Sequence, residues 1–423
     1  MSFTALHRTT GAAPGPITDE LLNAAVAAGV REARDLDWKS ELPPRKNIAQ
    51  TDFPKDVAAM ANSGGGVIVY GVREMQKAAT ERAHIVEFDE GYERALRSAA
   101  VTAISPPVFA LSVHVLDGDG ARAVVVEVPA SVDGPHLIYR NDYFGAPVRN
   151  DADTVWMKER EVANAYRARF DEQRHAREAL TNLYAQVSAG RATVPHAWLY
   201  AVASPRVPNV TSGMDRTDAR EIFESAFSLA KGWTNGIGVR PLAAVEWYNP
   251  RPGLRSWVAP NRTQGAQLWN EAWASVYRSG ATGLACTVGG HRKSVDGYFK
   301  PTQVESTAVE NAVADLLALV RVLAQRGCGV EYDVMVGIEW ADTEPLEILT
   351  RDGLGQTYAG VSTPLHRFLP VEVTVDAGVD EDAFQGQVRE LAQDCINQGG
   401  VSYLQAILEG RDGVPQVRSR RPQ

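Results

Sequence analysis

The chain has 423 residues, of which 44% are hydrophobic and 22% are charged, and its formal net charge is -9. This length predicts more than one domain, and the acidic balance argues against a general polyanion binder while leaving a local basic groove open. No apolar run is long enough to cross a bilayer, and three distant cysteines indicate neither a disulfide framework nor a zinc knuckle, so we expect a cytoplasmic protein without membrane contact.

The first part of the chain alternates between helical and extended patterns, which predicts an α/β domain built on a mixed sheet. A proline in the first turn and the glycines that follow mark the two ends of one short helix. The turn at 117–120 predicts a hairpin. The predicted elements are helices over 17–31, 51–63 and 156–189, strands over 36–39, 67–72, 110–115 and 121–128, and a pair of short strands over 137–148.

The rest of the chain predicts a second mixed α/β domain, whose role we do not assign. Trp269, Trp273 and Tyr277 recur at helical spacing, which predicts one buried helical stripe. The other predicted elements are strands over 197–203, 243–247, 332–340 and 371–375, and helices over 219–231, 304–326 and 381–397. The expected divisions are a flexible lead (1–16), the first domain (17–170), a connecting helix (171–190), the C-terminal domain (191–410) and a flexible tail (411–423).

A run of three glycines, Gly64–Gly66, lies between a predicted helix and a predicted strand. Phosphate-binding glycine loops have the opposite order, because the N-terminus of the following helix supplies the N–H donors. Here the helix presents its carbonyl end, and no Lys-Ser or Lys-Thr pair follows. The pattern therefore argues against an ATP site. It favours a left-handed helix cap and a close approach of backbone to a neighbour or ligand.

Acidic residues and a lysine gather around the first predicted strand. Asp37 and Lys39 point to one face of that strand, and Glu32 precedes them by a few residues. Glu74, just after the strand over 67–72, supplies a third acid. Three carboxylates can hold Mg²⁺ or Mn²⁺, and the lysine can steady phosphate charge, as a metal-dependent nuclease requires. The alternative is a charged strand edge with ordinary surface ion pairs.

Five further residues are candidates for contact with a nucleic acid. Arg45 and Lys46 lie in a loop beside the predicted acids, where they can reach a phosphate backbone. Arg140, Tyr143 and Arg149 combine guanidinium groups with an aromatic ring, a combination that holds phosphates and stacks bases. The alternatives are a solvated loop for the first pair, and sheet packing with ion pairs for the other three.

The order and spacing of these segments resemble the Schlafen AlbA-like domain family over residues 28–168. That family shows an E-x4-E-F-K strand, a helix that ends in A-N-x-x-G-G, a strand that ends in G-V-D-D, a V-P-x-S…P-H segment and a closing Y-x-R strand. The matching segments of this chain are ExxxxDWK at 32–39, DVAAMANSGGG at 56–66, VIVYGVRE at 67–74, VVEVPAS at 125–131, GPH at 134–136, and the strand at 143–149.

The resemblance implies a mixed α/β domain that binds nucleic acid, RNA or DNA. Some members of the family cut tRNA or other structured RNA with three acids, and their positions match Glu32, Asp37 and Glu74. Lys39 matches the lysine after the second acid. Two departures stand out: the second acid is aspartate rather than glutamate, and Arg73-Glu74 replaces a pair of aspartates.

The resemblance therefore predicts a metal-dependent endoribonuclease. By analogy, such an enzyme suits bacterial stress or phage defence. Because one copy of the domain is visible, we expect a homodimer. Two alternatives remain open at this point. One is a DNA-binding regulator that uses the same groove without turnover, and the other is a protein-interaction module in which the acids are surface charges.

Overall fold

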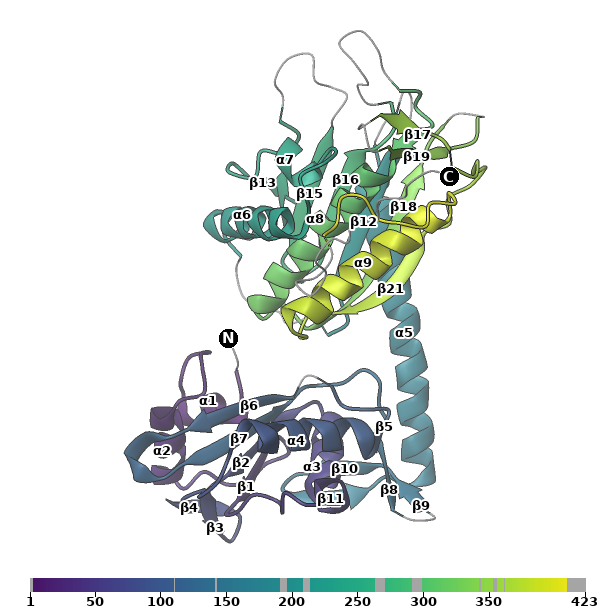
Figure 1. Ribbon diagram of the computed structural model, residues 1–423. Helices are drawn as coiled ribbons and strands as arrows, with labels where there is room; N and C mark the ends of the chain where they lie inside the picture. The colour runs from purple at the N-terminus through teal and green to yellow at the C-terminus, as the bar shows by residue number, and fades with distance from the viewer. Residues whose placement is uncertain are drawn as a thin grey trace, which may run out of the picture. The chain divides into compact units, whose positions relative to one another are not determined.

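A computed structural model describes residues 3–109, 111–140, 143–190, 196–207, 214–262, 271–290, 299–341, 344–352, 356–360 and 362–408; the side chains of Asp119, Arg140 and Tyr143 are outside this description. The chain divides into two compact units, Met1–His175 and Ala176–Gln423. Each unit carries its own sheet and helices (Figure 1). The structure confirms the predicted α/β class.

Unit 1 is built on a four-stranded mixed sheet with the order β1-β2-β7-β6. The first two strands pair in parallel, and the other neighbours pair antiparallel. The predicted hairpin is confirmed, because β6 and β7 are antiparallel neighbours. The strands are β1 (Leu36–Lys39), β2 (Gly66–Tyr70), β6 (Ser112–Leu116) and β7 (Ala123–Val128).

Helices cover both faces of this sheet, because the buried side chains of each strand alternate between two cores. Leu36, Trp38 and Val67 pack with α1 and α2 on one face. Ile68 and Tyr70 pack with α3 and α4 on the other face. The helices are α1 (Ala5–Thr10), α2 (Asp19–Ala27), α3 (Phe53–Ala61) and α4 (Glu90–Thr102).

Short strand pairs complete unit 1. One hairpin, β3–β4, follows β2 directly, and a three-stranded sheet has the order β5-β8-β9. The last pair, β10–β11, leads into the long helix α5, which crosses the boundary between the units. These elements are β3 (Val72–Met75), β4 (Ala78–Arg82), β5 (Ile104–Ser105), β8 (Leu137–Arg140), β9 (Tyr143–Gly145), β10 (Pro147–Asn150), β11 (Asp153–Trp156) and α5 (Glu159–Ser188).

The glycines between α3 and β2 let the strand start in a crowded place. Gly64 and Gly65 have φ of +95° and +86°, in the left-handed region that glycine tolerates. A Cβ on Gly65 would lie 2.7 Å from the backbone nitrogen of Ala130, and one on Gly66 would lie 2.8 Å from Cα of Asp35. The backbone therefore passes directly against two neighbouring segments, as the sequence predicts.

We expect Gly65→Ala to destabilise the protein more than Gly64→Ala. Both substitutions carry the cost of a positive φ, about 1 kcal/mol, but a Cβ at Gly64 has no atom within 4 Å. The difference between the two free energies of unfolding, measured in urea, therefore reports the steric clash alone. Equal losses of stability in the two variants would contradict the close approach at Gly65.

Unit 2 is built on an antiparallel sheet with the order β13-β14-β15-β16-β12-β18-β21. A second, smaller sheet has the order β17-β19-β20. The strands are β12 (Trp198–Pro205), β13 (Arg251–Gly253), β14 (Ser256–Ala259), β15 (Ala272–Tyr277), β16 (Thr282–Thr287), β17 (Gln303–Glu305), β18 (Glu331–Glu339), β19 (Glu347–Arg351), β20 (Thr357–Tyr358) and β21 (Val371–Asp376).

Helices α6 (Arg216–Trp233), α8 (Ser306–Gln325) and α9 (Glu381–Asn397) cover one face of the large sheet (Figure 1), and α7 (Pro241–Ala244) is a single turn. The C-terminal part of α5 contributes Leu180, which packs on Val202 and Met335. Helix α8 is buried along almost its whole length, including several polar side chains. Within it, the carboxylate of Glu310 accepts backbone N–H groups from residues 405–407.

Most predicted elements of unit 2 are present, with two exceptions. The predicted strand over 243–247 is wrong, because α7 extends to Ala244 and Val245 is in an isolated bridge with Asn261. The predicted helical stripe is also wrong, because Trp273 and Tyr277 lie on β15; Trp269 is outside the described residues. Aromatic residues four apart share a helix face, but a strand places them on one face too, so the spacing alone is ambiguous.

No helix in the described parts of the chain has the length and apolar character that crossing a membrane requires.

Candidate functional site

The site lies where β1 faces α3. Strand alternation places Leu36 and Trp38 in the core beside α1 and α2. Asp37 and Lys39 therefore point to the opposite face, toward α3, as the sequence predicts. The parallel pairing of β1 with β2 fixes this arrangement, because Asp37 is opposite Ile68 in the register.

Asp37 is buried and is held by two cations. Its residue is 2% exposed. One carboxylate oxygen, Oδ1, accepts from Nη1 of Arg149 at 3.2 Å, and the other, Oδ2, lies 2.5 Å from Nζ of Lys39. Burial opposes the charge on Lys39, but nearby carboxylates, chiefly Asp37, outweigh burial and raise the pKa of Lys39 above its ordinary value. The two cations thus stabilise the buried negative charge of Asp37.

Asp56, on the first turn of α3, is a member of the site that was not among the predicted acids. It is 5% exposed, and its Oδ2 lies 4.0 Å from Nζ of Lys39. Burial, followed by the charge of Asp37, raises the pKa of Asp56 to about 6. The available signal is its position four residues before buried Met60, because that spacing places an acid on the apolar face of the helix.

Ion pairs of alternating sign continue from the interior to the surface. Nζ of Lys55 lies 3.9 Å from Oδ1 of Asp56 and 3.0 Å from Oδ1 of Asp52. The chain of ion pairs therefore draws on β10, β1 and α3. In order it runs Arg149, Asp37, Lys39, Asp56, Lys55 and Asp52.

Glu32 and Glu74 come close to this network from the β3–β4 side. The backbone N–H of Glu32 donates to the carbonyl of Lys77, in the turn of that hairpin, at 2.7 Å. Its Oε1 accepts from the backbone N–H of Trp38 at 3.1 Å. Burial is the main cause that raises the pKa of Glu32, and the charges of Asp37 and Glu74 raise it further. Glu74 itself is exposed on β3. The structure thus brings Asp37 and Glu74 within electrostatic reach of Glu32.

These acids do not form a ready cation site in this arrangement. Among the described residues, no three side chains of the metal-ligating types are placed to hold one ion. The reason is visible at Asp37, where both oxygens already face a cation, so a metal would have to displace Lys39. Glu32 also uses one oxygen to accept from the backbone of β1. The expected Mg²⁺ or Mn²⁺ ligands therefore do not fit a metal as they stand.

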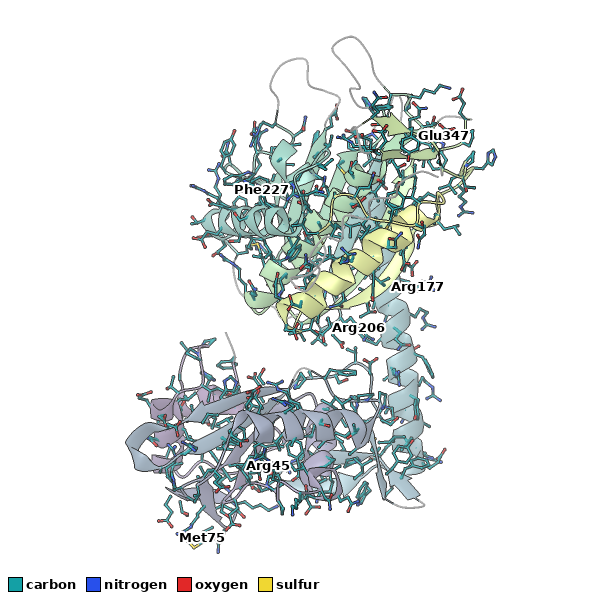
Figure 2. All side chains as sticks on the ribbon, in the orientation of Figure 1. Arg45, Met75, Arg177, Arg206, Phe227 and Glu347 are labelled. Atoms are coloured by element: carbon teal, nitrogen blue, oxygen red, sulfur yellow. The ribbon has the colours of Figure 1, made fainter. Side chains whose placement is uncertain are left out.

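The predicted nucleic-acid contacts fall into three groups. Arg45 and Lys46 are exposed, and Arg45, labelled in Figure 2, pairs with Asp89 at 3.1 Å. Arg140 pairs with Tyr143 in the β8–β9 register, but their side chains are outside the described residues.

For Arg149, the structure replaces the predicted nucleic-acid contact with an interior role. The residue is 6% exposed, and its guanidinium binds Asp37 and the hydroxyl of Thr154. A phosphate could not reach it without opening the domain.

The strand that carries Arg149 is fastened to the C-terminal end of α3. Ser63 Oγ accepts from the backbone N–H of Arg149 at 2.8 Å. The amide of Asn62 donates to the carbonyls of His136 and Pro147, and its oxygen accepts from the N–H of His136 at 2.7 Å. The A-N-S segment before the glycines therefore positions β10, and through it the arginine that holds Asp37.

Comparison with known proteins matches part of unit 1 to a domain family. Residues 32–158 match the family model described as Schlafen, AlbA_2. Among solved structures, the N-terminal domain of a Nitrosomonas europaea protein described as related to the ATP-dependent DNA helicase RecG shares 16% identity over 34% of this chain and 94% of its own, with a TM-score of 0.26. The DIP2311 protein of Corynebacterium diphtheriae shares 17% identity over 50% of this chain and 37% of its own, with a TM-score of 0.23.

At these TM-scores the two structures add nothing to the assignment, which rests on the family match. No protein with a curated description matches the chain. The matched residues contain β1, α3, β2 and the strand of Arg149, which are the elements that build the charged site. Residues 32–158 of this chain therefore form a Schlafen AlbA_2 domain.

Proposed function

We propose that unit 1 binds nucleic acid. The observation that carries the proposal is the match of residues 32–158 to the AlbA_2 model, because it covers every strand and helix that builds the charged site. Lys39 gives the site a chemical basis for binding, since its side chain is 37% exposed and its ammonium is kept charged. Exposed Arg45 and Lys46 lie on the loop between β1 and α3 and supply further phosphate contacts.

The test is a binding titration with tRNA and with duplex DNA, in EDTA, over a series of salt concentrations. We expect log K to fall linearly with log[salt], with a slope of about −0.7 to −0.9 for each phosphate contact. An Arg45→Ala/Lys46→Ala variant should lower the slope without changing the melting temperature of the protein. Absence of binding to both nucleic acids at low salt would overturn the proposal and favour the protein-interaction alternative.

Metal-dependent cleavage of RNA is the narrower form of this proposal. The proximity of Asp37 and Glu74 to Glu32 supports it, whereas the pairing of Asp37 with Arg149 favours binding without turnover. Glu74→Gln is the sharpest variant, because Glu74 is exposed and its loss should leave the fold intact. If the acids are catalytic, wild type should cut tRNA in Mn²⁺ and Glu74→Gln should cut at least about a hundredfold more slowly.

Binding of duplex DNA in EDTA, with no cutting of RNA in Mg²⁺ or Mn²⁺, would instead support the DNA-binding regulator. Equal cutting by wild type and Glu74→Gln would remove the site assignment. The homodimer and the role in phage defence stay predictions.

A further inference from the structure

Two lysines from different elements flank the same buried carboxylate. Nζ of Lys39, on β1, lies 4.0 Å from Oδ2 of Asp56. Nζ of Lys55, on α3, lies 3.9 Å from Oδ1 of the same residue. Each ammonium faces a different oxygen of Asp56, so this one carboxylate attracts both lysines.

The lysine side chains are more accessible than the buried carboxylates of Asp37 and Asp56. The side chains of Lys39 and Lys55 are 37% and 25% exposed, whereas those of Asp37 and Asp56 are 3% and 7% exposed. An anion that approaches from solvent therefore meets the lysine side chains, with exposed Asp52 beside Lys55, before either buried acid. Each ammonium has three N–H donors and is shared between two carboxylates, so each keeps a donor for a ligand.

We propose that Lys39 and Lys55 together bind one backbone phosphate of a nucleic acid, and that Asp56 is the residue that positions them. This inference rests on the proposed nucleic-acid binding and names its phosphate contact. Lys55 enters as a contact residue of the site, and Asp56 acts through the two lysines rather than touching the ligand. The buried carboxylate lowers the entropic cost of holding two long, flexible side chains in place.

The experiment measures the affinity of the full chain for tRNA by fluorescence anisotropy over a salt series. Lys55→Gln and Lys39→Gln should each weaken binding several-fold and lower the salt slope, by roughly 0.7 to 0.9 in all when both lysines are lost, because they share one phosphate. Lys55→Arg, which keeps the charge, should restore most of both. Lys158→Gln is the matched control, because Lys158 is an exposed lysine that is not among the ion pairs of Asp37 and Asp56. The affinity and salt slope of this variant should equal those of wild type.

A double-mutant cycle tests the role of Asp56. In the wild-type background the losses of binding free energy from Lys39→Gln and Lys55→Gln should be non-additive, because both ammonium groups bind one phosphate. In the Asp56→Asn background the two losses should add. Additive losses in both backgrounds would overturn the positioning role.

Failure of this inference differs from failure of the proposed function. If wild type binds tRNA and Lys55→Gln keeps its affinity and slope, the lysine pair is wrong while nucleic-acid binding stands. If wild type does not bind at any salt concentration, the proposed function fails and the inference fails with it. Inorganic phosphate at millimolar concentration serves as the competitor, and it should displace tRNA from wild type more readily than a phosphate-free buffer of equal ionic strength.

Discussion

Replacing Arg149 with methionine should lower the free energy of unfolding by about 3 kcal/mol. The guanidinium is one of two cations that hold the buried carboxylate of Asp37, at 3.2 Å. Removal of one partner of a buried pair leaves a charge without compensation, and that loss lies at about 3–5 kcal/mol. We place the effect at the lower end, because Lys39 still lies 2.5 Å from the other oxygen. Urea unfolding followed by circular dichroism measures the change.

Two controls separate this effect from loss of packing. Arg73→Met removes an exposed pair with Glu81 and should change stability by no more than about 0.5 kcal/mol. The double variant Asp37→Asn/Arg149→Met also removes the uncompensated charge of Asp37 and should recover part of the lost free energy of unfolding. If the single and double variants are equally unstable, the electrostatic account of Arg149 is wrong.

Asp56 should make the stability of the protein depend on pH between about pH 4 and pH 7. Burial raises the pKa of its carboxyl to about 6 in the folded state, from 3.8 in the unfolded chain. The folded protein therefore holds this proton more tightly, and the contribution of Asp56 to stability falls as pH rises through that window. Above the folded pKa the penalty is complete and constant. The whole effect is on the order of 2–3 kcal/mol.

The measurement compares wild type with Asp56→Asn by chemical denaturation at pH 4.5, 6 and 8. The variant lacks the titrating group, so its stability relative to wild type should increase with pH and level off above pH 7. Asp52→Asn is the matched control, because Asp52 is exposed and also pairs with Lys55. Its stability relative to wild type should change much less with pH. A constant difference between wild type and Asp56→Asn at all three pH values would contradict the raised pKa.

The site was only partly predictable from the sequence. The alternation of β1 is a local property, so it correctly separates Asp37 and Lys39 from the core residues Leu36 and Trp38. The burial of Arg149 is not local, because it depends on how β10 is fastened to the end of α3. Its predicted contact with nucleic acid follows from residue type alone, and residue type does not distinguish an arginine at the surface from one that holds a buried acid.

By itself the sequence determined the α/β class, the pairing of acid and lysine on one face of β1, the crowded glycine turn, and the match of residues 32–158 to the AlbA_2 family. These features follow from short-range periodicity, turn chemistry and motif order. Only the tertiary structure decided which charges meet. In the structure, Asp56 and Lys55 of α3 join the site, Arg149 is buried, and each oxygen of Asp37 faces a cation. The physical reason is that the strength and sign of an electrostatic site depend on distance and burial, which chain order does not specify.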